Sequence, residues 1–203
     1  MTPSQALGNS MHLVLHDYHK NGTDIWKSLD TNWIKEGYSD KKHEQESLEK
    51  AKKFLTEYLK SGLYKNANPI YLEQPFSFNI SDLKIGGKMD RVDDLGDGEI
   101  EIIDYKTGAN VPTQKDIDRD LQMSIYALAA TYKGVLNHPI EKVKLSFYYF
   151  DNQKKVTTIR TKEQLEETRK ELLAIRSEIE KSDFQCSGNK LCESCEFKML
   201  CNG

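Results

Sequence analysis

Cysteine is absent from the first 185 residues, and the four cysteines of the chain all lie between residues 186 and 201. A secreted protein held together by disulfides would spread its cysteines along the chain. Long apolar runs are also missing, since no stretch approaches the roughly 18 residues that a membrane-spanning helix needs. The N-terminal residues lack the basic start and apolar core of a signal peptide. We therefore expect a cytoplasmic protein without a membrane-spanning segment.

A strong excess of charge is lacking too. The chain has 29 lysines and arginines against 32 aspartates and glutamates, which gives a net charge of −3 over 203 residues. No global positive field therefore favours nucleic acid, although a local groove can be basic on a neutral protein. The candidates for such a local track are Lys20, Lys115, Arg119 and Lys133.

The spacing of apolar residues predicts a mixed α/β domain. Helices are expected over residues 3–20, 26–34, 40–61, 115–133 and 162–181, and strands over residues 70–80, 83–94, 99–105, 142–150 and 154–160. The first three strands are expected to form an antiparallel meander with a turn at residues 94–98. A single domain results, with a helical cap (1–65), an α/β core (66–182) and a cysteine-rich tail (183–203).

Asp90, Asp104 and Lys106 form the strongest chemical signal. The period of two in a strand puts Asp104 and Lys106 on the same face, and pairing through the turn brings Asp90 close to Asp104. Two adjacent carboxylates repel each other unless a cation lies between them, and their oxygens suit Mg²⁺ or Mn²⁺. A lysine beside such a pair can orient a water molecule or stabilise charge on a phosphate.

The alternative is that these residues are ordinary charges at the ends of surface strands, with Lys106 in a salt bridge. An isolated D-x-K pattern is more often of this kind. The strand that leads to Asp104 is apolar, however, with isoleucine at positions 100, 102 and 103. A carboxylate that emerges from a buried strand needs a stabilising partner, which favours the functional interpretation.

Four segments together resemble the RecB-type branch of the PD-(D/E)XK nuclease superfamily. The core of that branch resembles residues 87–93 (GKMDRVD) and 103–108 (IDYKTG). Its Q-x-x-x-Y motif resembles residues 122–126 (QMSIY), and its G-x-x-x-H motif resembles residues 8–12 (GNSMH). Glu73 resembles the acidic residue of the first core strand. The chain departs from the pattern at Met89, which replaces the proline of the superfamily's name.

The resemblance implies a restriction-endonuclease-like fold and a set of site residues. The implied metal ligands are Asp90, Asp104, the backbone carbonyl of Tyr105, and His12. Lys106 is the implied catalytic lysine. Gln122 and Tyr126 lie four residues apart on one helical face and are implied to line the active site. The implied role of Glu73 is either to help at the metal or to position its strand.

The function that the resemblance implies is cleavage of DNA phosphodiester bonds with Mg²⁺ or Mn²⁺. Its implied substrates are single strands or duplex ends in recombination or repair, with a helicase as partner or as a fused domain. One alternative is a non-catalytic module of the same fold that binds DNA ends or a helicase. Another is a nuclease that acts on RNA or on an intermediate of CRISPR adaptation.

Other patterns among these residues are weaker. His12, His16 and His19 have a spacing that can bind zinc, but the glutamate of H-E-x-x-H is missing, and we expect His16 and His19 to be solvated. The K-T-G at residues 106–108 has no S-x-N before it, which excludes a penicillin-binding enzyme. Residues 90–97 do not fit the spacing of an EF-hand loop.

The tail carries Cys186, Cys192, Cys195 and Cys201. Four thiolates can hold zinc or a [4Fe–4S] cluster. The last three resemble the C-terminal triplet of the iron–sulfur RecB-type nucleases, among them AddB-type and CRISPR-associated enzymes, in which an upstream cysteine supplies the fourth ligand. Here the upstream cysteine is missing, so either the chain is a piece of a longer protein or Cys186 takes the fourth place. The further alternative is a set of free thiols.

Overall fold

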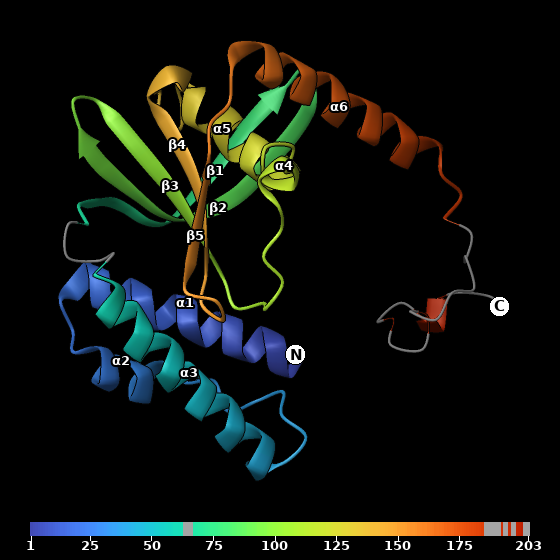
Figure 1. The fold of residues 1–203 in the computed structure, drawn as a ribbon. Helices are drawn as coiled ribbons and strands as arrows, with labels where there is room; N and C mark the ends of the chain where they lie inside the picture. Colours follow the sequence, from blue (N-terminus) through green and yellow to red (C-terminus); the bar gives the residue numbers. More distant parts are fainter. Residues whose placement is uncertain (63–66, 185–191, 193–194, 196–197, 201–203) are drawn as a thin grey trace.

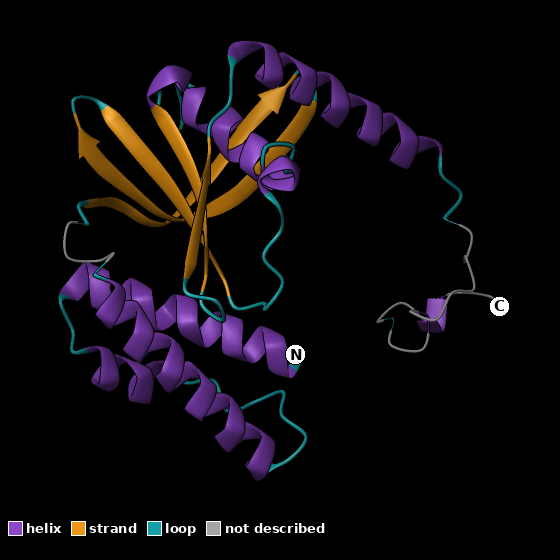
Figure 2. Ribbon diagram, in the orientation of Figure 1, coloured by secondary structure: helices purple, strands orange, loops and turns teal. Residues whose placement is uncertain are grey.

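The computed structural model describes residues 1–62, 67–184, 192, 195 and 198–200. It has a mixed five-stranded sheet flanked by helices, which confirms the predicted fold class (Figures 1 and 2). The helices are α1 (Pro3–Asn21), α2 (Ile25–Asn32), α3 (Lys41–Ser61), α4 (Gln114–Ile117), α5 (Leu121–Thr131) and α6 (Lys162–Lys181), with short 3₁₀ turns at Ile140–Lys142 and Lys198–Leu200. The strands are β1 (Pro69–Ile80), β2 (Leu83–Gly96), β3 (Glu99–Lys106), β4 (Val143–Tyr149) and β5 (Lys154–Thr158).

The strands follow one another across the sheet in chain order. Strands β1, β2 and β3 form the predicted antiparallel meander, and Gly96, Asp97 and Gly98 all have positive φ in the turn between β2 and β3. Strands β3 and β4 are parallel, so α4 and α5 form the crossover that such a pair requires. Arg91 pairs with Ile103, and this register places Asp90 across from Asp104.

Each face of the sheet has its own apolar core, because the side chains of a strand alternate. Ile103 and Tyr105 of β3 pack with the buried residues of α1, α2 and α3. Ile100 and Ile102 of the same strand pack with α5 and α6. Figure 1 shows α1, α2 and α3 together on one side of the sheet and α5 on the other. The helices of the cap and the crossover therefore approach the sheet from opposite faces.

The single helix predicted over residues 115–133 is wrong, since the structure divides it into α4 and α5. The side chain of Asp120 accepts a hydrogen bond from the Met123 amide and begins α5. The buried guanidinium of Arg160 donates to the carbonyls of Ile117 (2.9 Å) and Asp120 (3.1 Å). The Ile117 carbonyl also accepts from the Asp120 amide, and the Asp120 carbonyl from the Ser124 amide, so the guanidinium adds a second donor on each side of the break and stabilises it.

The cysteine tail is described only in part. Cys186 and Cys201 lie outside the described residues, so the predicted ligand set falls partly outside them. The backbone amide of Cys195 donates a hydrogen bond to the Cys192 carbonyl. Among the residues that the structure describes, no helix combines the length and the apolarity that crossing a membrane requires.

Candidate active site

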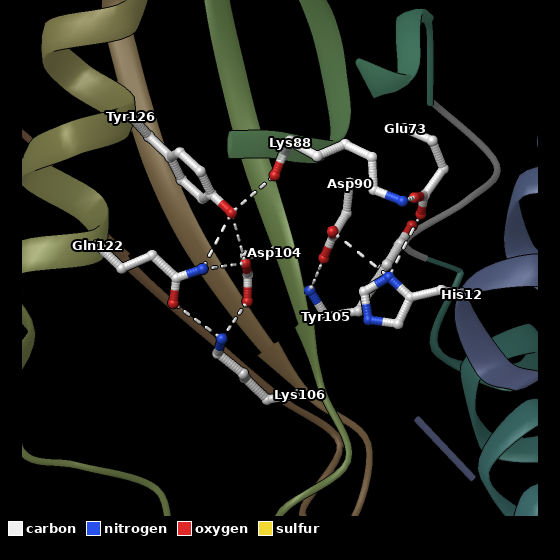
Figure 3. Close-up of polar contacts among 9 residues, drawn as sticks. All are labelled: His12, Glu73, Lys88, Asp90, Asp104, Tyr105, Lys106, Gln122 and Tyr126. Carbon is white, nitrogen blue, oxygen red and sulfur yellow. Dashed lines mark hydrogen bonds and ion pairs between the residues drawn. The ribbon is translucent and has the colours of Figure 1, made fainter. Parts of the chain in front are cut away.

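His12, Glu73 and Asp90 come together from three different elements (Figure 3). His12 Nδ1 on α1 lies 3.3 Å from Glu73 Oε1 on β1 and 3.4 Å from Asp90 Oδ1 on β2. One nitrogen or oxygen atom of each residue lies within 4.8 Å of the others, which is close enough for all three to bind one metal ion. They line a cavity of about 500 Å³ between α1 and the strands.

An unusual backbone conformation positions Glu73. Its φ is 49°, in the left-handed region that non-glycine residues rarely adopt. Leu72 pairs with Arg91 and Gln74 with Met89, so Glu73 lies across from Asp90. Strained backbone of this kind costs roughly 1–3 kcal/mol and is concentrated at functional sites. The conformation is therefore consistent with a role for the Glu73 carboxylate in the site.

A positive charge on His12 balances the two carboxylates. Burial alone would lower the pKa of His12, but the hydrogen bonds and charges of Asp90 and Glu73 outweigh burial and raise that pKa to about 10. Burial would raise the pKa of Glu73, but hydrogen bonds from His12 and Lys88 lower it below its ordinary value. The two carboxylates therefore face a shared cation, the imidazolium of His12, and Glu73 also pairs with Lys88.

A second group of side chains surrounds Asp104 on the adjacent strand. Lys106 Nζ lies 2.6 Å from Asp104 Oδ2, as the period of two predicts, and 4.9 Å from the centre of the Phe147 ring. Asp104 is 3% exposed, and burial followed by the charge of Asp90 raises its pKa. Its Oδ2 is buried, and among the described residues its partner is the Lys106 ammonium, whose charge and hydrogen bond counteract this rise.

Gln122 and Tyr126 of α5 hold the Asp104–Lys106 pair in place. Gln122 Oε1 accepts from Lys106 Nζ (2.9 Å), and Gln122 Nε2 donates to Asp104 Oδ1 (2.8 Å). The Tyr126 hydroxyl lies 2.9 Å from Asp104 Oδ1 and 3.0 Å from the Lys88 carbonyl. Burial, with the charge of Asp104, raises the pKa of Tyr126, so its hydroxyl stays protonated and can donate.

Asp90 connects the two groups. Its Oδ1 faces His12, and its Oδ2 accepts a hydrogen bond from the Tyr105 backbone amide at 2.8 Å. The structure thus brings the residues of the predicted nuclease site into one neighbourhood, without the tail cysteines, but it groups them differently from the predicted ligand set. Glu73, whose role the sequence left open, joins His12 and Asp90, whereas Asp104 pairs with Lys106 outside the 4.8 Å group.

At two residues the structure differs from what the sequence predicts. The sequence analysis assigned no role to Lys88, which pairs with the second oxygen of Glu73. Because Lys88 lies two residues before Asp90, the period of two in a strand could have placed both on the same face. The prediction that His19 is solvated is wrong. Its ring lies 2.8 Å from the Tyr58 hydroxyl and 3.0 Å from Arg91 Nη1, and burial with the charge of Arg91 lowers its pKa to about 3.

Comparisons with known proteins bear on the family and on the fold. The family model of the PD-(D/E)XK nuclease superfamily matches residues 1–202. The crystal structure of a "Putative exonuclease" from Eubacterium rectale covers 96% of this chain and 74% of its own, with a TM-score of 0.56 and 12% identity. The structure of SSO0001 covers 98% of this chain and 84% of its own, with 18% identity and a TM-score of 0.44. No curated protein matches the chain. The chain belongs to the PD-(D/E)XK nuclease superfamily.

Proposed function

We propose that this chain is a divalent-metal-dependent deoxyribonuclease that hydrolyses phosphodiester bonds. The observation that carries the proposal is the convergence of His12, Glu73 and Asp90 next to the Asp104–Lys106 pair. The two carboxylates suit Mg²⁺ or Mn²⁺, and the imidazole, a transition-metal ligand, favours Mn²⁺ of the two. Because the superfamily is one of nucleases, a metal site beside a lysine is best explained as the centre of the reaction.

The residues present fit a metal ion. His12, Glu73 and Asp90 would hold it, and Asp104, whose Oδ2 is paired with Lys106, supplies further carboxylate oxygens on the adjacent strand. A bound divalent ion lowers the pKa of a coordinated water and neutralises charge on the phosphate. His12 must then be neutral, because a ligating nitrogen gives up its proton.

Lys106 supplies the second half of the proposed mechanism. Its side chain is one-third exposed, so it can reach a water or a phosphate oxygen in the site. Gln122 fixes the direction of its ammonium, which is also paired with Asp104. Lys106 would orient the attacking water and stabilise the negative charge that develops on the phosphate. Tyr126 would keep Asp104 in position through its hydroxyl.

The finer parts of the proposal concern substrate and partner. We propose single strands or duplex ends as the substrate, in recombination or repair. The similarity to a protein described as an exonuclease supports action at ends. The net charge of −3 supports a helicase, as partner or as a fused domain, because the helicase would supply the non-specific grip on DNA.

Membership of the RecB-type branch also belongs to the proposal. It is supported by the G-x-x-x-H motif at residues 8–12, because His12 reaches the carboxylates of two strands. A structural zinc ion or [4Fe–4S] cluster on the tail cysteines rests on their spacing and on the resemblance to the iron–sulfur RecB-type nucleases, and two of those cysteines lie outside the described residues.

A cleavage assay tests the proposal. End-labelled single-stranded DNA, duplex DNA and RNA are incubated with the protein in Mn²⁺, in Mg²⁺ and in EDTA. We expect cleavage of DNA in either metal and none in EDTA, and the pattern of labelled products reports polarity. Binding of DNA ends without cleavage in any metal would instead support the non-catalytic module. Cleavage that continues in EDTA would contradict the proposal.

Replacement of His12 should weaken metal binding more than it alters the fold. His12→Ala removes a nitrogen ligand and leaves two carboxylates, so we expect about a 10–100-fold rise in the Mn²⁺ concentration that gives half-maximal cleavage. Isothermal titration with Mn²⁺ measures the same loss without substrate. His43→Ala, on the exposed N-terminal turn of α3, is the matched control and should bind Mn²⁺ as the wild type does. Equal Mn²⁺ affinity in all three proteins would remove His12 from the ligand set.

A further inference from the structure

Two neighbouring cavities lie where α1 packs against β1. The first, of about 500 Å³, holds His12, Glu73 and Asp90. The second, of about 330 Å³, is named here the flanking groove. Its lining residues are His16, His19, Lys20, Pro69, Ile70, Tyr71, Leu72 and Gln74. Nothing in the proposed mechanism uses it.

The flanking groove begins where the first cavity ends. On α1 the first cavity uses Asn9, His12 and Leu13, and the groove continues on the same helix one turn later with His16. On β1 the metal-facing Glu73 lies between Leu72 and Gln74, which both line the groove. The helix rises by 1.5 Å per residue, so Lys20, at the far end of the groove, lies roughly 12 Å along α1 from His12. It is therefore a continuation of the site.

The chemistry of the groove differs from that of the rest of the surface. Its lining contains no carboxylate, although the chain has 32 acidic residues, and it contains Lys20 and two histidines. Tyr71 and Ile70 are 41% and 44% exposed, so an aromatic ring and an aliphatic side chain lie open beside the lysine. A cation next to an exposed ring is the pairing that binds a single nucleic-acid strand, in which phosphates and stacked bases alternate.

A larger cavity is less suited to a nucleic-acid strand. It has a volume of about 570 Å³ and lies between α6 and the segment that precedes β4. Its basic residues Lys162 and Arg169 are paired with Glu141 and Glu166, and it shares no lining residue with the cavity that holds His12. Of the four basic residues that the sequence offered as a local track, only Lys20 lines a cavity beside the site.

We propose that the flanking groove binds the nucleotides of a single strand next to the bond that is cut, with a base stacked on Tyr71 and a phosphate held by Lys20. The inference rests on the proposed nuclease function, since it assigns the groove to the substrate of the same site. A strand bound in this way is single-stranded over the length of the groove. A duplex end would therefore have to separate before its strand enters.

Binding measured in EDTA tests the groove without cleavage. The probe is a short fluorescein-labelled oligodeoxythymidylate, and its anisotropy is followed over a range of salt concentrations. Tyr71→Ala should weaken binding about tenfold, which is the effect of losing one stack between a base and an aromatic ring. Tyr71→Phe keeps the ring and should bind the oligonucleotide as the wild type does. Lys20→Gln should weaken binding and reduce the slope of log K against log[salt] by about 0.7, the value for one phosphate on a single strand.

Matched controls come from the far end of α6. Phe184→Ala removes an exposed aromatic ring, and Lys181→Gln removes a lysine that, like Lys20, lies in the last turn of its helix. Both should bind as the wild type does. Groove variants that bind as tightly as the wild type, or a wild type that does not bind the oligonucleotide, would overturn the inference. Weakened binding in a protein that cuts no DNA would leave the groove standing and refute the nuclease function.

Discussion

Lys106→Ala should lower the rate of DNA cleavage by about 10²–10³-fold, which is the usual effect of removing one group that stabilises charge in a transition state. The Lys106 ammonium lies 2.6 Å from Asp104 and is held by Gln122 at 2.9 Å, so no other described cation occupies that position. Single-turnover cleavage of end-labelled single-stranded DNA in Mn²⁺ measures the loss.

The fold should survive this substitution, because Lys106 is one-third exposed and lies at the end of β3. Thermal unfolding of Lys106→Ala checks this directly. Lys144→Ala is the matched control, since Lys144 is also a strand lysine paired with a carboxylate, that of Glu99 at 2.8 Å, but lies on the surface. The control should cleave at the wild-type rate. Cleavage by Lys106→Ala at the same rate as Lys144→Ala would show that Lys106 has no part in the reaction.

The largest loss of stability is expected from Arg91→Met. Arg91 is 2% exposed, and its guanidinium donates to Asp93 and to the hydroxyls of Tyr58 (3.0 Å) and Tyr105 (3.3 Å). Methionine fills part of the space but leaves Asp93 as a buried carboxylate without its cation. Breaking a buried pair from one side costs about 3–5 kcal/mol. Urea unfolding without metal measures this fall in the free energy of unfolding.

A double variant separates the lost charge from the lost packing. Arg91→Met with Asp93→Leu removes both charges, so it should be more stable than Arg91→Met alone, because no unpaired carboxylate remains buried. The two residues are in contact, so the two single effects are not expected to add. A double variant that is less stable than either single variant would show that packing around Arg91, and not its charge, is what stabilises the interface between the cap and the sheet.

The elements of the fold could be predicted because their signals are local. Apolar periodicity indicates α1, α3, α6 and the strands to within a few residues. The break between α4 and α5 could not be predicted, because its stabilising donor is Arg160, which lies about forty residues further along the chain. The parallel pairing of β3 with β4 was also not apparent, since it depends on where α5 packs on the sheet.

The same distinction holds for the site. The D-x-K spacing and the i, i+4 spacing of Gln122 and Tyr126 are local patterns, and the structure brings these residues together. The place of Glu73 depends on a single left-handed residue within a strand and on α1 lying against β1, so the sequence left its role open. His19 was misjudged for a related reason, since its partners Tyr58 and Arg91 come from other elements.

The residues of the site are far apart along the chain, which has a consequence during synthesis of the protein. His12 leaves the ribosome early, but its carboxylate partners on β1 and β2 follow more than sixty residues later, and Gln122 and Tyr126 follow later still. Lys106 is held only after α5 has packed over β3, and that packing accompanies the slow, non-local pairing of β3 with β4. A nascent or misfolded chain therefore carries no assembled centre.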